Sequence, residues 1–106
     1  MLATALAVLA HGGHGCISVT ANVAPRLCAE FQNACTEGRW SDALVLQDRL
    51  MPLHMSLFVE TSPAPVKYAV SLLGRCTPDL RLPLVPVTDA TRDKVRTAMM
   101  AVGLLS

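Results

Sequence analysis

Charge is missing from the start of this 106-residue sequence, where no Asp, Glu, Lys or Arg precedes Arg26. A segment of that length in contact with water would normally carry several charged side chains. The formal net charge of the whole chain is +1, which gives no electrostatic basis for binding nucleic acid or an anionic membrane. We therefore expect neither of them as a partner, and we expect the uncharged segment to be buried against other protein.

The sequence also lacks an apolar run of the about 20 residues that a membrane-spanning helix needs. The run over residues 1–10 stops at the His and Gly residues of positions 11–15. A secretion signal is not favoured either, because its basic start is missing from the first four residues. We favour a helix and a strand that are buried on both faces in a large cytoplasmic α/β protein, which fits the high apolar fraction of 52%.

Cys-x-x-Cys pairs are absent, and the cysteine spacing matches no common zinc or disulfide framework. We expect buried free thiols in a reducing compartment at Cys16, Cys28, Cys35 and Cys76. The pattern His11-x-x-His14-x-Cys16 could be taken for a metal site, but no carboxylate lies near it in sequence. Gly12-Gly13 precedes a strand, whereas phosphate loops follow one. We predict a glycine-rich turn here, with no metal.

Apolar spacing and turn residues predict one strand among several helices. Residues 2–9 are typical of the end of a helix, and the β-branched segment Cys16–Thr20 is typical of a strand. Spacings of three and four residues predict four later helices. We expect these to run from Pro25 to Glu37, from a Ser41 cap to Leu57, from Val66 to Leu73, and from a Thr88 cap to Gly103. Prolines make residues 80–86 an extended connector.

A single strand cannot form a sheet, because its backbone N–H and C=O groups need neighbours. The order of helix, strand and four helices therefore predicts the end of a parallel α/β fold, followed by an extra helical region. Residues 1–38 belong to the first part and residues 39–106 to the second. The chain itself is expected to be mostly helical.

No nucleophile, base and orienting group stand at a recognisable spacing. Lys67 is expected to be solvated or paired, and ion pairs are possible between Glu60 and Lys67 and between Asp79 and Arg81. His54 lies on the apolar stripe of the long helix, where a hydrogen-bonded core or interface histidine is the expected state. The methionines on the helices, namely Met51, Met55, Met99 and Met100, are predicted to fill the core.

Several segments resemble the 4-hydroxy-tetrahydrodipicolinate synthase (dihydrodipicolinate synthase) family in their order along the chain. They are residues 12–25 (GGHGCISVTANVAP), 50–54 (LMPLH), 57–60 (LFVE), 63–67 (PAPVK), 80–84 (LRLPL) and 101–105 (AVGLL). The resemblance covers about residues 6–106. It implies a (β/α)8 TIM barrel with a C-terminal helical extension. Residues 1–38 would then hold the end of helix 7, strand 8 and helix 8.

The resemblance also implies an activity. Family members condense pyruvate with aspartate semialdehyde in lysine (diaminopimelate) biosynthesis, and the complete enzyme is expected to be a homotetramer. Pyruvate forms a Schiff base with a barrel lysine and a tyrosine relays protons, so no separate cofactor is implied. Both groups come from earlier strands, and Lys67 and Tyr68 do not match them. The chain thus holds no catalytic residue, while Ile17 matches a residue that lines the pyruvate site.

Two alternatives stay open. The chain could be a non-catalytic helical interaction module, because it lacks a catalytic set. It could also belong to another pyruvate-dependent aldolase, such as N-acetylneuraminate lyase, although the segments at residues 63–67 and 80–84 favour the synthase. In every case we expect the chain alone to show no synthase activity.

Overall fold

The computed structural model describes residues 2–105, and the regular structure in that range is entirely helical. Two short 3-10 helices and five α-helices follow one another along the chain. They are η1 (Leu2–Thr4), α1 (Ala5–Ala10), η2 (Thr20–Asn22), α2 (Pro25–Thr36), α3 (Trp40–Ser56), α4 (Ala64–Leu72) and α5 (Asp89–Ala101). The molecule is elongated, with extents of 41 × 30 × 21 Å.

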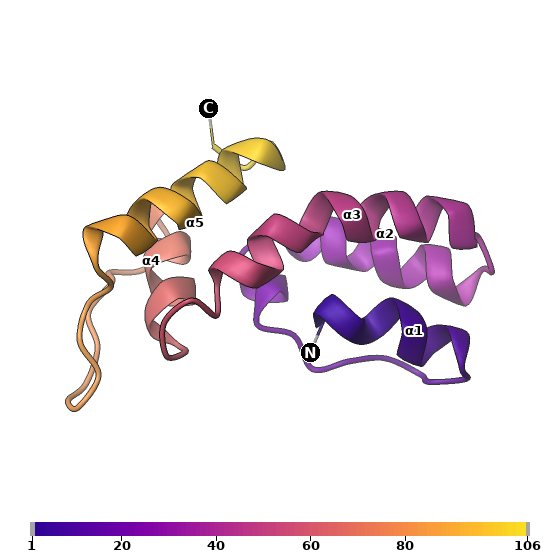
Figure 1. The fold of residues 1–106 in the computed structure, drawn as a ribbon, viewed down its shortest axis with the longest axis horizontal. Coiled ribbons are helices and arrows are strands. Elements are labelled where there is room, and N and C mark those ends of the chain that lie inside the picture. The colour runs from indigo at the N-terminus through magenta and orange to yellow at the C-terminus, as the bar shows by residue number, and fades with distance from the viewer. Residues whose placement is uncertain (1, 106) are drawn as a thin grey trace.

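The long helix α3 joins the two ends of this shape (Figure 1). Helices α1 and α2 pack against one part of it, while α5 packs near its C-terminal end and covers α4. The core contains large side chains with at most 1% exposure, among them Phe31, Leu50, Leu53, Leu57 and Met99. Their helices are among those that the apolar spacings of three and four residues predicted, so the helical part of the sequence analysis is confirmed.

The start of α3 differs from the sequence prediction. Ser41 was expected to cap this helix, but the helix begins at Trp40 and Arg39 occupies the cap position. Gly38 takes a left-handed conformation with φ of 73°, which turns the chain at once and lets the next helix start early. The Arg39 guanidinium then pairs with Glu37 at 2.6 Å and with Asp42 at 2.9 Å across the turn.

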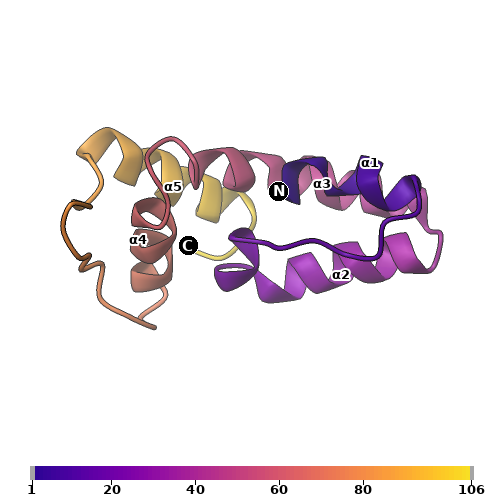
Figure 2. The same cartoon turned by 90° about the horizontal axis from the view of Figure 1, so that it is seen from below.

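The predicted strand over Cys16–Thr20 is wrong for the part of the chain that the structure describes. Residues 14–18 are irregular and Thr20 already opens η2. A strand is defined by its hydrogen bonds to a neighbouring strand, and residues 2–105 contain no such neighbour. Figure 2 shows the segment running back in the direction opposite to both α1 and α2.

The C-terminal part follows the sequence prediction closely. Residues 80–86 form neither helix nor strand. Thr88 caps α5 as expected, because its hydroxyl accepts a hydrogen bond from the backbone N–H of Thr91 at 3.3 Å. The buried face of this helix includes Val95, Ala98 and Met99.

Candidate functional site

The extended segment at residues 14–18 holds the one position that the sequence analysis assigned to a binding site. The side chain of Ile17 is 96% exposed. None of the backbone N–H and C=O groups of these five residues has a hydrogen-bond partner among the described residues. Ile17 therefore lies on an open surface here.

The residues on either side of Ile17 face the opposite way, toward α2. Gln32 on α2 donates a hydrogen bond to the sulfur of Cys16 at 3.4 Å. Cys16 and Ser18 line a hollow of about 350 Å³ together with Gly15, Ala21, Pro25, Cys28, Ala29 and Gln32. Burial, with a smaller contribution from Cys16, raises the pKa of the Cys28 thiol to about 11. This alternation of side chains is the pattern of a β-strand.

Hydrogen bonds fix the chain at both ends of this segment. The backbone N–H of Gly13 donates to the carbonyl of Val8 at 2.9 Å, which ties the start of the segment to α1. At its other end the hydroxyl of Thr20 lies 2.8 Å from Nδ1 of His54 on α3, and both residues are only 2% exposed. Burial lowers the pKa of His54. The expectation of a hydrogen-bonded core histidine is confirmed.

Lys67 and Tyr68 occupy structural positions on α4. The ammonium group of Lys67 donates to the backbone carbonyl of Asp79 at 2.5 Å. The ring of Tyr68 lies 5.5 Å from the guanidinium carbon of Arg92. The ion pairs considered for Lys67 with Glu60 and for Asp79 with Arg81 are not formed, because among residues 2–105 only Arg39 makes such pairs.

The remaining candidates are the possible metal ligands and the cysteines. No three His, Cys, Asp or Glu side chains lie close enough to hold a metal ion within residues 2–105, and Nδ1 of His11 is 2.7 Å from the carbonyl of Ala7. All four cysteines are free, and Cys28 and Cys35 are buried. Cys16 and Cys76 are exposed, so the prediction that they are buried is wrong. No helix in the described range has the length and apolar character needed to cross a membrane.

Residues 3–102 match the Dihydrodipicolinate synthetase family. The chain belongs to this family. It is 60% identical over 103 residues to the 4-hydroxy-tetrahydrodipicolinate synthase of Afipia carboxidovorans, which covers 97% of the chain. The resemblance inferred from the sequence segments is thus confirmed.

Solved structures of the dihydrodipicolinate synthetase family have the same backbone. The synthase from Thermotoga maritima superposes with a TM-score of 0.95 over 98% of the chain at 38% identity, which is 35% of that structure. The chloride-inhibited synthase from Acinetobacter baumannii, solved in complex with pyruvate, gives a TM-score of 0.93 over 98% of the chain and 36% of that structure at 34% identity. The chain spans about 35% of the length of the curated relatives that it matches.

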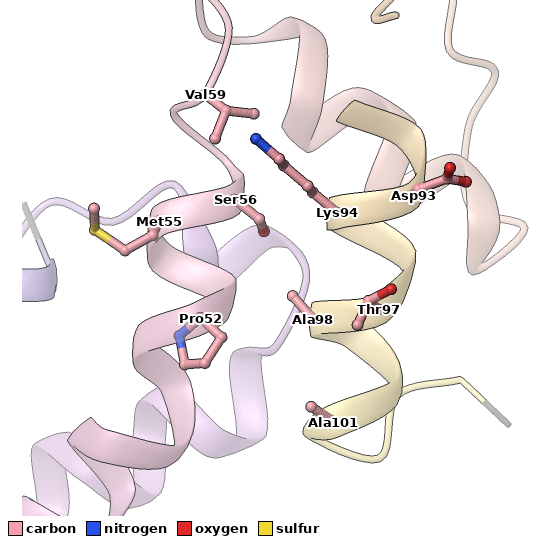
Figure 3. A pocket seen from close by; sticks show the side chains of 9 residues that line it. All are labelled: Pro52, Met55, Ser56, Val59, Asp93, Lys94, Thr97, Ala98 and Ala101. Carbon is pink, nitrogen blue, oxygen red and sulfur yellow. The ribbon is translucent and has the colours of Figure 1, made fainter. Parts of the chain in front are cut away.

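One feature of this family segment was not predicted from the sequence. A groove of about 450 Å³ lies between the end of α3 and α5 (Figure 3). It is lined by Pro52, Met55, Ser56, Val59, Asp93, Lys94, Thr97, Ala98 and Ala101. Met55 and Met100 are 57% and 48% exposed, so the prediction that they fill the core is wrong, although Met99 is fully buried. In the sequence, only the apolar residues near the end of α3 could have indicated the groove.

Proposed function

We propose that this chain supplies the closing part of a (β/α)8 barrel. Residues 1–38 would form the end of helix 7, strand 8 and helix 8, and residues 39–106 would form the C-terminal helical region. The unpaired segment at residues 14–18 is the observation that carries this proposal. Alternate residues of a barrel strand point into the barrel and toward the surrounding helices, which agrees with Cys16 facing α2 and Ile17 facing away.

The activity we propose is that of a cytoplasmic pyruvate-dependent lyase, 4-hydroxy-tetrahydrodipicolinate synthase, in lysine (diaminopimelate) biosynthesis. The complete enzyme, as a homotetramer, would condense pyruvate with aspartate semialdehyde. The names of the relatives at about 60% identity support this assignment, as does the related structure solved with pyruvate. N-acetylneuraminate lyase is disfavoured because these relatives at about 60% identity carry the synthase name.

Ile17 would act as an apolar wall of the pyruvate site. A lysine forms a Schiff base only in its unprotonated state, and an apolar surrounding disfavours the ammonium form. The Schiff-base lysine and the proton-relaying tyrosine would come from outside this chain. Lys67 does not compete for that role, because its ammonium group donates to the carbonyl of Asp79.

The test is a graft in which this chain replaces the matched 103 residues of the Afipia carboxidovorans synthase. We expect the graft to convert pyruvate and aspartate semialdehyde. In the graft, Ile17→Asp should lower kcat/KM by about 100-fold, the scale that a displaced reacting group costs. Ile17→Val should stay close to the unmodified graft.

A folded graft without synthase turnover would overturn the proposed activity. Turnover of N-acetylneuraminate in its place would assign the chain to that aldolase. A folded graft that is inactive with either substrate would favour the helical interaction module.

A further inference from the structure

Two of the four free thiols face the same hollow, between the segment at residues 14–18 and α2. Cys16 lies on the segment and Cys28 on α2, and both line the hollow of about 350 Å³. The sulfur of Cys16 accepts a hydrogen bond from Gln32 at 3.4 Å. Gln32 follows Cys28 by one helical turn, and side chains at that spacing are neighbours on a helix. The Cys16 thiol therefore lies beside the side chain of Cys28.

The two thiols also interact electrostatically across the hollow. Burial is the largest cause of the raised pKa of the Cys28 thiol, and Cys16 is the second. Two thiolates placed side by side repel each other, because like charges disfavour the ionised form of both groups. A cation bound between the two sulfur atoms would replace this repulsion with two attractive contacts.

The number of ligands determines which cation fits. Zinc sites and iron–sulfur clusters need three or four protein ligands, and no three His, Cys, Asp or Glu side chains within residues 2–105 could hold a metal ion together. Soft thiolate ligands select Cu(I), whereas Mg²⁺ and Ca²⁺ prefer oxygen ligands. A soft monovalent ion is satisfied by two sulfur atoms in a linear arrangement, so two cysteines are sufficient for it.

The hollow gives such an ion both an entrance and room to adjust the ligands. Cys16 is exposed and Cys28 is buried, so an ion can bind the outer sulfur first and the inner sulfur second. With a metal–sulfur distance of about 2.3 Å, two sulfur atoms in line with the ion lie about 4.6 Å apart. The backbone of residues 14–18 has no hydrogen-bond partner among the described residues, so Cys16 is able to move to that separation.

We propose that Cys16 and Cys28 form a two-coordinate binding site for a soft monovalent metal ion, Cu(I). Each sulfur binds as a thiolate, so two sulfur–copper bonds form and the proton of each thiol passes to the solvent. Copper stays in the +1 state, and no oxidant or reductant takes part in the binding step. The inference does not depend on the proposed function, because it uses only the side chains on the two sides of the hollow.

The experiment titrates Cu(I) into the full chain without oxygen, with a phosphine reductant and a chromogenic Cu(I) chelator as competitor. We expect the unmodified chain to bind one Cu(I) per molecule. Cys16→Ser and Cys28→Ser should each weaken binding by at least about 100-fold, because even the loss of an outer-shell partner of a metal costs about 10–100-fold. Cys76→Ser, at an exposed thiol, and Cys35→Ser, at a buried thiol of α2, are matched controls and should bind as the unmodified chain does.

X-ray absorption at the copper edge gives the coordination directly, and we expect two sulfur neighbours. Because Cys16 is exposed, the helical circular dichroism of Cys16→Ser should be unchanged, which separates loss of a ligand from loss of the fold. Four results would overturn the proposal: no retained copper, equal binding by Cys16→Ser, one ion shared between two chains, or copper with three or more sulfur neighbours.

Discussion

The contact between Thr20 and His54 is the polar link that holds η2 against the core of α3. The two residues lie 34 positions apart in the sequence, and their side-chain atoms meet at 2.8 Å in a buried site. Thr20→Val keeps the shape of the side chain and leaves Nδ1 of His54 without a partner. We expect this to lower the free energy of unfolding by about 1–3 kcal/mol, measured by urea denaturation of the chain.

Thr20→Ser is the control for this substitution, because it retains the hydroxyl group. It should recover most of the stability that Thr20→Val loses. If the valine variant is as stable as the unmodified chain, the contact contributes nothing to the fold.

His54 also predicts how stability depends on pH. Its pKa in the unfolded chain is near the ordinary value of about 6.5, and burial lowers the pKa in the folded chain. The unfolded state therefore binds more protons as the pH falls through this range, and the free energy of unfolding decreases. We expect urea midpoints to be highest above pH 7 and to fall between pH 7 and pH 5.

His54→Gln removes the titrating group. The variant should be less stable at neutral pH, but its urea midpoint should change less between pH 7 and pH 5. An unmodified chain whose stability rises on acidification over that interval would contradict the buried neutral state of His54.

At the level of single residues, the sequence predicted the environment of His54 but not its partner. Its position on an apolar stripe indicates burial, since helix periodicity is local. Thr20 is the partner because η2 folds onto α3. A local sequence pattern gives no information about that long-range contact. The surroundings of Met55 were missed for the same reason, because α5 leaves a groove where a packed helix face was expected.

A few side-chain hydrogen bonds fix the N-terminus of α5. Thr88 caps the helix through Thr91, and the carboxylate of Glu60 accepts hydrogen bonds from the N–H of Thr88 at 3.0 Å and from its hydroxyl at 3.2 Å. Hydrogen bonds from Thr91 and Thr88 lower the pKa of Glu60. Thr88→Ala should cost about 0.5–2 kcal/mol of unfolding free energy. Thr97→Ala, at an exposed position of the same helix, is the matched control and should be nearly neutral.

Two glycines in and after the turn that follows α1 should differ in how well they tolerate a larger side chain. A Cβ at Gly13 would lie 2.9 Å from the carbonyl oxygen of Val8, whereas a Cβ at Gly15 would meet nothing within 4 Å. Gly13→Ala should therefore destabilise the chain by about 1–3 kcal/mol, and Gly15→Ala by less than about 0.5 kcal/mol. Thermal unfolding followed by circular dichroism measures both, and equal melting temperatures would contradict the close packing at Gly13.

Whole elements were predictable where their signals were local. Pro25 marks the start of α2, Thr88 the start of α5, and the prolines of residues 80–86 the connector. The strand predicted at Cys16–Thr20 is not formed, because a strand needs a neighbour outside its own segment. Its residue pattern is still that of a strand, and its side chains alternate as strand side chains do.

For the whole molecule, exposed apolar side chains match the apolar excess in the composition. Ile17 and Leu82 are 96% and 87% exposed, and Val45 is 67% exposed. Under the proposed function, the Schiff-base lysine and the proton-relaying tyrosine come from outside this chain. We therefore expect the chain alone to show no turnover of pyruvate with aspartate semialdehyde above a buffer control, in a coupled assay at high protein concentration.

Amide hydrogen exchange at residues 15–18 tests the barrel hypothesis most directly. In the isolated chain these amides should exchange nearly as fast as in an unfolded peptide, because they have no hydrogen-bond partners. In the graft with the Afipia carboxidovorans synthase they should become protected to the same degree as the amides of α2. Fast exchange in an active graft, or strong protection in the isolated chain, would contradict the assignment of this segment as a barrel strand.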